Sequence, residues 1–370
     1  MQIYTNENVL NAARRRIHFL FDEFENIIVS ISGGKDSTVC CHLALQEAHR
    51  RDRKIGIFFL DEEVVYQATV EQVRYLMTLY PENTVKYWFQ FEFNLTNSNS
   101  IEEPQLKCWE ASKRKIWMRP KEKDAICRKP WDIAKETIRN KNKGFGYYDV
   151  LENFVNSRIR TAFILGIRAI ESPTRWQAVT KNKCYKNIYW GTKRKNDNYS
   201  FYPIYDWGFA DVWKYLAENN VRYSRIYDYQ FLKRLPSNEM RVSGLITEKS
   251  FGAITELPAF EPETYEKLCR RLKGARFAFD YGKNKKVMKC QVLPDRFQNW
   301  SEYRDFLLET YPYPDKKAIF EKRFAHQLNN NYVARQQCRQ LVLNDYENNI
   351  PVVNKDDPAV KRIDYWRSIL

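Results

Sequence analysis

The stretch that decides the fold is Ile27-Ile28-Val29-Ser30-Ile31-Ser32-Gly33-Gly34-Lys35-Asp36-Ser37-Thr38. Four of its first five residues are β-branched, which predicts a buried strand. Residues 32–34 predict a sharp turn, after which residues 36–38 can cap a helix. Two adjacent glycines let the backbone approach a ligand, and the helix start offers N–H groups and a positive dipole end to an anion. Because Lys35 adds a positive charge, the turn is typical of a phosphate-binding site.

Residues 32–37, Ser-Gly-Gly-Lys-Asp-Ser, resemble the PP-loop, Ser-Gly-Gly-x-Asp-Ser, of the ATP pyrophosphatase superfamily. Neither the Walker A spacing nor a dinucleotide-binding Gly-x-Gly-x-x-Gly occurs at this turn. The resemblance implies ATP binding and, in many members, cleavage between the α and β phosphates, which forms an adenylate and releases pyrophosphate. In the branch that contains phosphoadenosine phosphosulfate (PAPS) reductase, the same fold holds a sulfonucleotide. The alternative is an ordinary strand–helix corner with a surface lysine.

The composition favours a cytoplasmic protein that binds polyanions. Its 370 residues are 44% hydrophobic and contain no run of about 18 apolar residues that would cross a membrane. The N-terminus lacks the apolar segment of a signal peptide. Eight scattered cysteines without a Cys-x-x-Cys argue against zinc, an iron–sulfur cluster and a disulfide framework. The net charge of +15 indicates nucleotides, and allows nucleic acid, as partners.

Four further strand-like runs alternate with helical segments, at residues 54–60, 85–91, 161–167 and 201–207. The alternation predicts an α/β fold with a mostly parallel, five-stranded sheet between helices. Asp61, Glu62 and Glu63 follow the second strand, where an acidic side chain can reach ribose hydroxyls or a magnesium ion. Acidic residues also favour first helical turns. We therefore predict that Asp61 binds nucleotide or Mg²⁺, and leave the two glutamates open.

A second candidate site is Gly166-Ile167-Arg168-Ala169-Ile170-Glu171-Ser172-Pro173-Thr174-Arg175. Two arginines seven residues apart, just past a strand end, can converge on one phosphate chain. The pattern Gly-x-Arg-x-x-x-Ser-x-x-Arg also resembles a signature of the PAPS-reductase-like branch. By that resemblance Arg168 and Arg175 would contact the nucleotide phosphates, and Gly166 would belong to the same site. With Lys35, the two arginines are the predicted catalytic residues.

Two basic segments suggest a further surface. Residues 107–143 carry thirteen Lys/Arg against five Asp/Glu, interleaved with Trp109, Trp117 and Trp131. Basic and aromatic residues together suit a nucleic-acid surface, but a solvated helical insertion that buries its tryptophans explains them equally well. Residues 181–195 hold six Lys/Arg and no acidic residue, which predicts a mobile loop over the site.

The resemblance extends over residues 8–274. Residues 203–213 are similar to the Pro-x-x-x-Trp … Asp-Val-Trp segment that closes the nucleotide domain of the same branch. Residues 109–120 and 261–265 resemble a bacterial and phage subgroup of predicted PAPS sulfotransferases or reductases. This subgroup includes proteins of the immunoglobulin-binding regulator A type, encoded beside ParB-like partners, so a ParB-like partner is implied for this chain.

The chain departs from true PAPS reductases because it lacks their C-terminal Glu-Cys-Gly-x-His motif, whose cysteine attacks sulfur. Cys338 lies in the corresponding region between Arg335 and Arg339, which would lower the pKa of an accessible thiol. A single cysteine in a basic helix is more often incidental. The sequence therefore disfavours reduction, and the role of Cys338 stays open.

We expect residues 1–235 to form the PP-loop domain, with a basic insertion at about 100–150, and residues 236–370 to form a smaller, mainly helical domain. Tyr365 and Trp366 predict that the C-terminal tail docks. The predicted function is Mg²⁺-dependent cleavage of ATP that adenylylates an acceptor and releases pyrophosphate. The alternatives are a PAPS reductase or sulfotransferase, and a non-catalytic, nucleotide-gated regulator that binds DNA or a ParB-like protein.

Overall fold

The computed structural model describes residues 6–100, 102–128, 150–151, 153–155, 159–180, 183–237, 240–242, 244–247, 254–282, 284, 286 and 289–369. The chain forms two compact units. Unit 1 comprises residues 1–93 and 119–242, and unit 2 comprises residues 94–118 and 243–370. The first part of the predicted insertion thus groups with unit 2, and the boundary at 235/236 stays a prediction. Across the described ranges, no helix has the length and apolar character needed to span a membrane.

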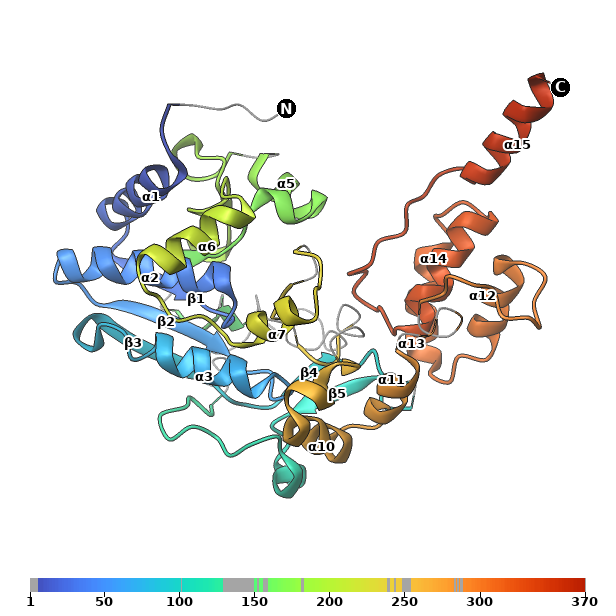
Figure 1. The fold of residues 1–370 in the computed structure, drawn as a ribbon, viewed down its shortest axis with the longest axis horizontal. Helices are drawn as coiled ribbons and strands as arrows, with labels where there is room; N and C mark the ends of the chain where they lie inside the picture. Colours follow the sequence, from blue (N-terminus) through green and yellow to red (C-terminus); the bar gives the residue numbers. More distant parts are fainter. Residues whose placement is uncertain are drawn as a thin grey trace. The chain divides into compact units, whose positions relative to one another are not determined.

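Unit 1 is built on a sheet with the strand order β3-β2-β1-β6-β8-β7, of which β1, β2 and β3 are labelled in Figure 1. Its strands are β1 (Asn26–Ser30), β2 (Ile55–Leu60), β3 (Thr84–Phe89), β6 (Thr161–Leu165), β7 (Gly191–Lys193) and β8 (Tyr199–Phe201). All neighbours are parallel except β7 and β8. The α/β class and the mostly parallel sheet are confirmed, but the expectation of five strands was wrong because β7, inside the predicted loop 181–195, adds a sixth.

The apolar pattern of β1 explains how the sheet is covered. Successive strand residues point to opposite faces. Ile27 and Val29 therefore join the core formed with α1 and α2, whereas the neighbouring strands contribute Phe58 and Phe163 to an aromatic cluster with Phe154. Both faces of the central strands are buried, as parallel sheets require.

The helices of unit 1 are α1 (Val9–Glu23), α2 (Lys35–Arg50), α3 (Gln67–Leu76), α5 (Pro173–Thr180), α6 (Phe209–Glu218) and α7 (Ile226–Leu232). Short 3-10 segments occur at Pro81–Asn83 (η1), Ala169–Glu171 (η4), Tyr185–Asn187 (η5) and Lys195–Asp197 (η6). Helix α2 packs on β1, β2 and β6, and α1 and α6 pack beside α2 (Figure 1). This packing places the start of α2 at the carboxyl end of β1.

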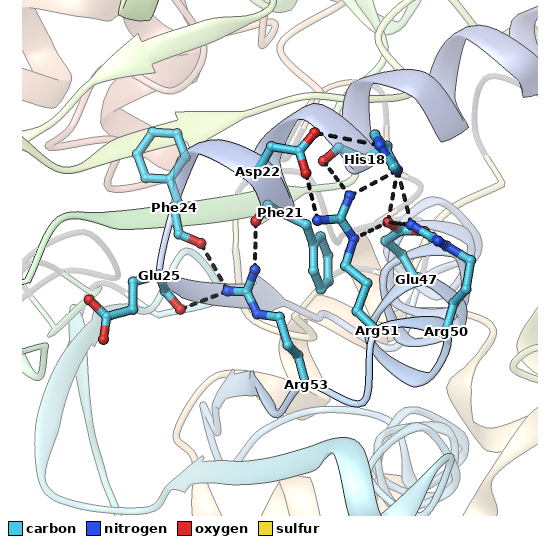
Figure 2. A network of polar contacts seen from close by, with 9 residues as sticks. All are labelled: His18, Phe21, Asp22, Phe24, Glu25, Glu47, Arg50, Arg51 and Arg53. Carbon is cyan, nitrogen blue, oxygen red and sulfur yellow. Dashed lines mark hydrogen bonds and ion pairs between the residues drawn. The ribbon is translucent and has the colours of Figure 1, made fainter.

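An ion network fastens the end of α1 to the end of α2 (Figure 2). Glu47 accepts hydrogen bonds from Arg50 and Arg51, and Arg51 also pairs with Asp22 at 2.6 Å. Arg53 donates to three backbone carbonyls at the end of α1, namely those of residues 21, 24 and 25, at 2.6, 2.9 and 2.8 Å (Figure 2). These carbonyls have no partner within the helix ladder, so Arg53 acts as a C-terminal cap.

Unit 2 is mainly helical. Its elements are β4 (Phe93–Thr96), β5 (Gln105–Cys108), the 3-10 segment η2 (Ala111–Ile116), α9 (Leu257–Phe260), α10 (Pro262–Arg271), α11 (Ala275–Tyr281), α12 (Trp300–Glu309), α13 (Pro314–Phe324), α14 (Asn331–Val342) and α15 (Pro358–Ile369). One small core holds Cys290, Trp300 and Cys338. The expectation that Tyr365 and Trp366 dock was wrong, because both are exposed on α15.

Candidate functional site

The PP-loop residues form a closed turn between β1 and α2. Gly33 has φ +72°, and a Cβ there would lie 2.9 Å from Cγ2 of Thr69, so both the backbone conformation and the space require glycine. Ser37 Oγ donates to the carbonyl of Gly34 at 3.0 Å and accepts from the amide of Ser32 at 3.2 Å. Residues 36–38 were expected to cap the helix, but Gly34 is the N-cap and α2 already begins at Lys35.

Charged side chains alternate in sign around this helix start. Lys35 Nζ lies 2.9 Å from one oxygen of Asp36, and the other oxygen accepts from Arg168 Nε at 2.5 Å. Arg168 also contacts Glu171 at 3.2 Å, and the second oxygen of Glu171 pairs with Arg175. The structure thus brings together Lys35, Asp36 and both predicted arginines.

Lys35 is held in an unusual environment for a cation. Its side chain is only 4% exposed, and burial lowers its pKa, an effect that the neighbouring Asp36 carboxylate partly offsets. The ammonium group lies 5.4 Å from the ring centre of Tyr227 and 5.8 Å from that of Phe209. A negatively charged ligand would restore the stabilisation that the ammonium group loses by leaving water.

Gly166 links the two halves of the site by close packing. A Cβ there would come within 2.6 Å of the Ser37 amide nitrogen and the Asp36 carbonyl carbon. The end of β6 therefore reaches the first turn of α2 only because residue 166 is glycine. This approach brings Arg168, two residues further on, to Asp36.

Asp61 lies in a different set of contacts at the end of β2. It is 0% exposed, and Oδ2 accepts from Trp88 Nε1 at 2.9 Å and Gln90 Nε2 at 2.7 Å. Oδ1 accepts from the Glu63 amide at 3.0 Å and pairs with Arg119. A carboxylate has about four lone-pair positions, so these donors occupy the acceptor positions of the Asp61 carboxylate. Asp61 does not fit a magnesium ligand here, and we derive no step through a metal ion.

Glu62, the next residue, has a carboxyl group whose raised pKa keeps it protonated up to nearly neutral pH. Burial and the negative charge of Asp61 raise the pKa of Glu62 from its usual 4.5 to about 7. Its carboxyl group follows β2 directly, on the same edge of the sheet as the PP-loop. The sequence left Glu62 and Glu63 open, and only the tertiary environment distinguishes them.

Tyr227 is a site residue that sequence reasoning missed. Its hydroxyl oxygen accepts a hydrogen bond from the backbone amide of Lys35 at 3.1 Å. Burial keeps the hydroxyl protonated by raising its pKa. A phenolic hydroxyl that accepts a hydrogen bond can also donate its proton to another group. Nothing in the sequence links Tyr227 to a residue 192 positions away.

Cys338 is not an accessible nucleophile. It is buried in the small core of unit 2, its thiol faces the Trp300 carbonyl at 3.5 Å, and burial raises its pKa. The nearby arginine Arg335 instead donates to the carbonyl of Cys290 at 2.8 Å. The lowered pKa considered for this thiol was therefore wrong. Of the eight cysteines, only Cys127 is exposed.

The structure describes only part of the two predicted basic segments, residues 107–143 and 181–195. Trp109 is buried and meets Trp117 edge-on, with ring centres 5.5 Å apart. This packing favours a structural role for these two tryptophans over base stacking. Trp131 and residues 129–143 lie outside the described residues, as do 181 and 182. In the rest of 181–195, residues 191–193 form a strand, so the expectation of a loop was wrong there.

A parallel sheet with a glycine-rich turn at a helix start and two arginines beside it defines a nucleotide-binding protein of the PP-loop type. Residues 26–234 match the phosphoadenosine phosphosulfate reductase domain, and the chain belongs to this family. The predicted PAPS-reductase-like branch is thus confirmed, while the regulator A-type subgroup stays a prediction. Residues 234–332 match a domain of unknown function, DUF3440.

The proteins that are similar to this chain include a relative from Escherichia coli and a reductase of known structure. The uncharacterized protein YbdN of Escherichia coli (strain K12) is 27% identical over 329 residues, which cover 85% of this chain and 79% of YbdN. A crystal structure of phosphoadenylyl-sulfate reductase from Candida auris, in complex with phosphate, matches with 14% identity and a TM-score of 0.32. That match covers 62% of this chain and 93% of the reductase.

Proposed function

We propose that the chain binds ATP at its PP-loop and cleaves it between the α and β phosphates, transferring the adenylyl group to an acceptor and releasing pyrophosphate. The observation that carries this proposal is the cluster of Lys35, Arg168 and Arg175 around the start of α2. Three cations beside the start of a helix suit a ligand with several phosphates.

In the proposed reaction, the acceptor's nucleophile attacks the α-phosphorus. The bond from that phosphorus to the bridging oxygen breaks, and the electron pair leaves with pyrophosphate. Residues 33–37 and the Lys35 ammonium hold the leaving pyrophosphate, while Arg168 and Arg175 neutralise the charge that develops on the phosphate oxygens. Such donors stabilise the transition state because they are already in place before the reaction.

Two predicted nucleotide-site residues receive indirect roles. Gly166 permits the close approach of β6 to α2, and Asp61 orients Arg119 at the end of β2. Tyr227 is added as a hydrogen-bond donor to phosphate, since its oxygen accepts from the Lys35 amide and its O–H group lies beside the start of α2. Glu62 is the candidate to accept the proton of the attacking group, because its pKa of about 7 suits a general base at neutral pH.

Reduction of a sulfonucleotide is the second candidate function, favoured by the position of Cys127. This exposed thiol follows Ile126, whose backbone pairs with the end of β3, at the edge of the sheet where ligands bind. The buried Cys338 offers no such thiolate. Binding of nucleic acid or of a ParB-like protein, and a purely regulatory role, stay predictions.

The two functions are separated by their products. We expect the full chain, incubated with α-labelled ATP and candidate acceptors, to release pyrophosphate. Arg168→Ala should lose this activity by at least about a hundredfold, because it removes the cation shared by Asp36 and Glu171. Cys338→Ser and Cys127→Ser should retain it. Release of sulfite from PAPS that Cys127→Ser abolishes would establish reduction instead.

A further inference from the structure

Two carboxylates lie among the three cations of the phosphate site. Asp36 bridges Lys35 and Arg168, and Glu171 bridges Arg168 and Arg175 with one oxygen on each. The five side chains therefore carry a net charge of +1, from three positive and two negative groups. Asp36 is fixed within the first turn of α2, whereas Glu171 belongs to the short η4 segment.

Glu171 occupies the two arginines as a phosphate group would. Guanidinium groups bind carboxylate and phosphate through the same charge-assisted N–H···O bonds. Glu171 lies three residues after Arg168 and four before Arg175, so the short chain segment between them keeps the three residues close together. Any phosphate that reaches these arginines must compete with a carboxylate that is already bound.

We propose that Glu171 determines the specificity of the site: its carboxylate competes with ligand phosphate for Arg168 and Arg175, so that only ligands with several negative charges are retained. The inference deepens the proposed function and rests on it for the identity of the ligand. The opposing explanation is that Glu171 only positions the two arginines for binding.

The two explanations predict opposite effects of Glu171→Gln, which keeps the size of the side chain and removes its charge. If Glu171 competes with phosphate, the variant binds anions more tightly, and the gain grows with the charge of the anion because Coulomb energy scales with charge. If Glu171 only positions the arginines, the variant binds anions more weakly.

The probes are inorganic tripolyphosphate and inorganic phosphate, titrated into the full chain by calorimetry. We expect Glu171→Gln to bind tripolyphosphate about tenfold more tightly than the unmodified chain, with a smaller gain for phosphate. The matched control is Glu218→Gln, an exposed glutamate on α6 that pairs with Lys214. Its affinity for tripolyphosphate should be unchanged.

Equal or weaker binding of tripolyphosphate by Glu171→Gln, or no binding by either protein, would overturn the proposal. Glu171→Asp provides a second test if the first variant does not fold, since it keeps the charge and withdraws the carboxylate by one methylene. We expect its affinity to lie between the other two, and an affinity below that of the unmodified chain would also overturn the proposal. If tripolyphosphate behaves as expected but ATP does not bind, the nucleotide assignment fails while the role of Glu171 stands.

Discussion

Replacing Glu62 by glutamine should make the protein less sensitive to pH. Burial and the charge of Asp61 raise the pKa of Glu62 from its usual 4.5 to about 7 in the folded chain. Between these two values the unfolded chain has lost the proton while the folded chain still holds it. Because the folded state binds more protons there, the free energy of unfolding falls as pH rises through this window and levels off above pH 7.

The size of the effect follows from the two pKa values. The difference between 4.5 and about 7 corresponds to roughly 3 kcal/mol at most. Glu62 is partly accessible to solvent, so water screens some of this cost and we expect about 1–2 kcal/mol. Because glutamine cannot ionise, the Glu62→Gln variant does not incur this cost.

The assay is urea unfolding of the two proteins at pH 5 and pH 8, followed by circular dichroism. The stability of Glu62→Gln relative to the unmodified chain should increase by about 1–2 kcal/mol between pH 5 and pH 8. Glu218→Gln, at an exposed site, is the control and should show no such increase. Equal pH profiles for Glu62→Gln and the unmodified chain would refute the buried, protonated carboxyl group.

Three further variants test single contacts. Tyr227→Phe should weaken ATP binding about tenfold in calorimetry, because the O–H donor beside Lys35 is lost; unchanged affinity would remove Tyr227 from the site. Arg119→Met should lower the free energy of unfolding by about 3 kcal/mol in urea, since it leaves the buried Asp61 charge without its cation, and adding Asp61→Asn should restore much of the loss. Arg53→Met should cost about 2 kcal/mol in the same assay, because three helix-end carbonyls lose their donor, and an effect below 0.5 kcal/mol would contradict the cap.

The sequence was most informative where the local structure is determined by residues that are close together in the sequence. The β-branched run before the glycine turn predicted β1, and the turn itself predicted the start of α2. That this helix start binds phosphate stays a prediction. Strand β7 was missed because its three residues, Gly191–Lys193, form a strand only by pairing with β8. Likewise, Cys338 was considered as a thiolate from its flanking arginines, although burial in unit 2 determines its pKa.

The remaining site contacts join residues far apart in the chain. Arg119 lies 58 residues after Asp61. Its guanidinium group occupies an acceptor position of the carboxylate that the sequence predicted as a magnesium ligand. Tyr227 reaches Lys35 across 192 residues. Position at a strand end predicted that Asp61 faces the ligand edge, but hydrogen-bond partners determine what it can bind, and no local pattern encodes them.

The central claim is that the start of α2 binds ATP through its phosphates, and calorimetry of ATP binding to Lys35→Met tests it most directly. Methionine fills the space of the buried lysine stem without the charge, and Lys214→Ala, at an exposed site on α6, is the control. We predict that Lys35→Met weakens ATP binding by at least about thirtyfold, while its circular dichroism spectrum is unchanged and Lys214→Ala binds normally. Undiminished ATP affinity in folded Lys35→Met would contradict the account.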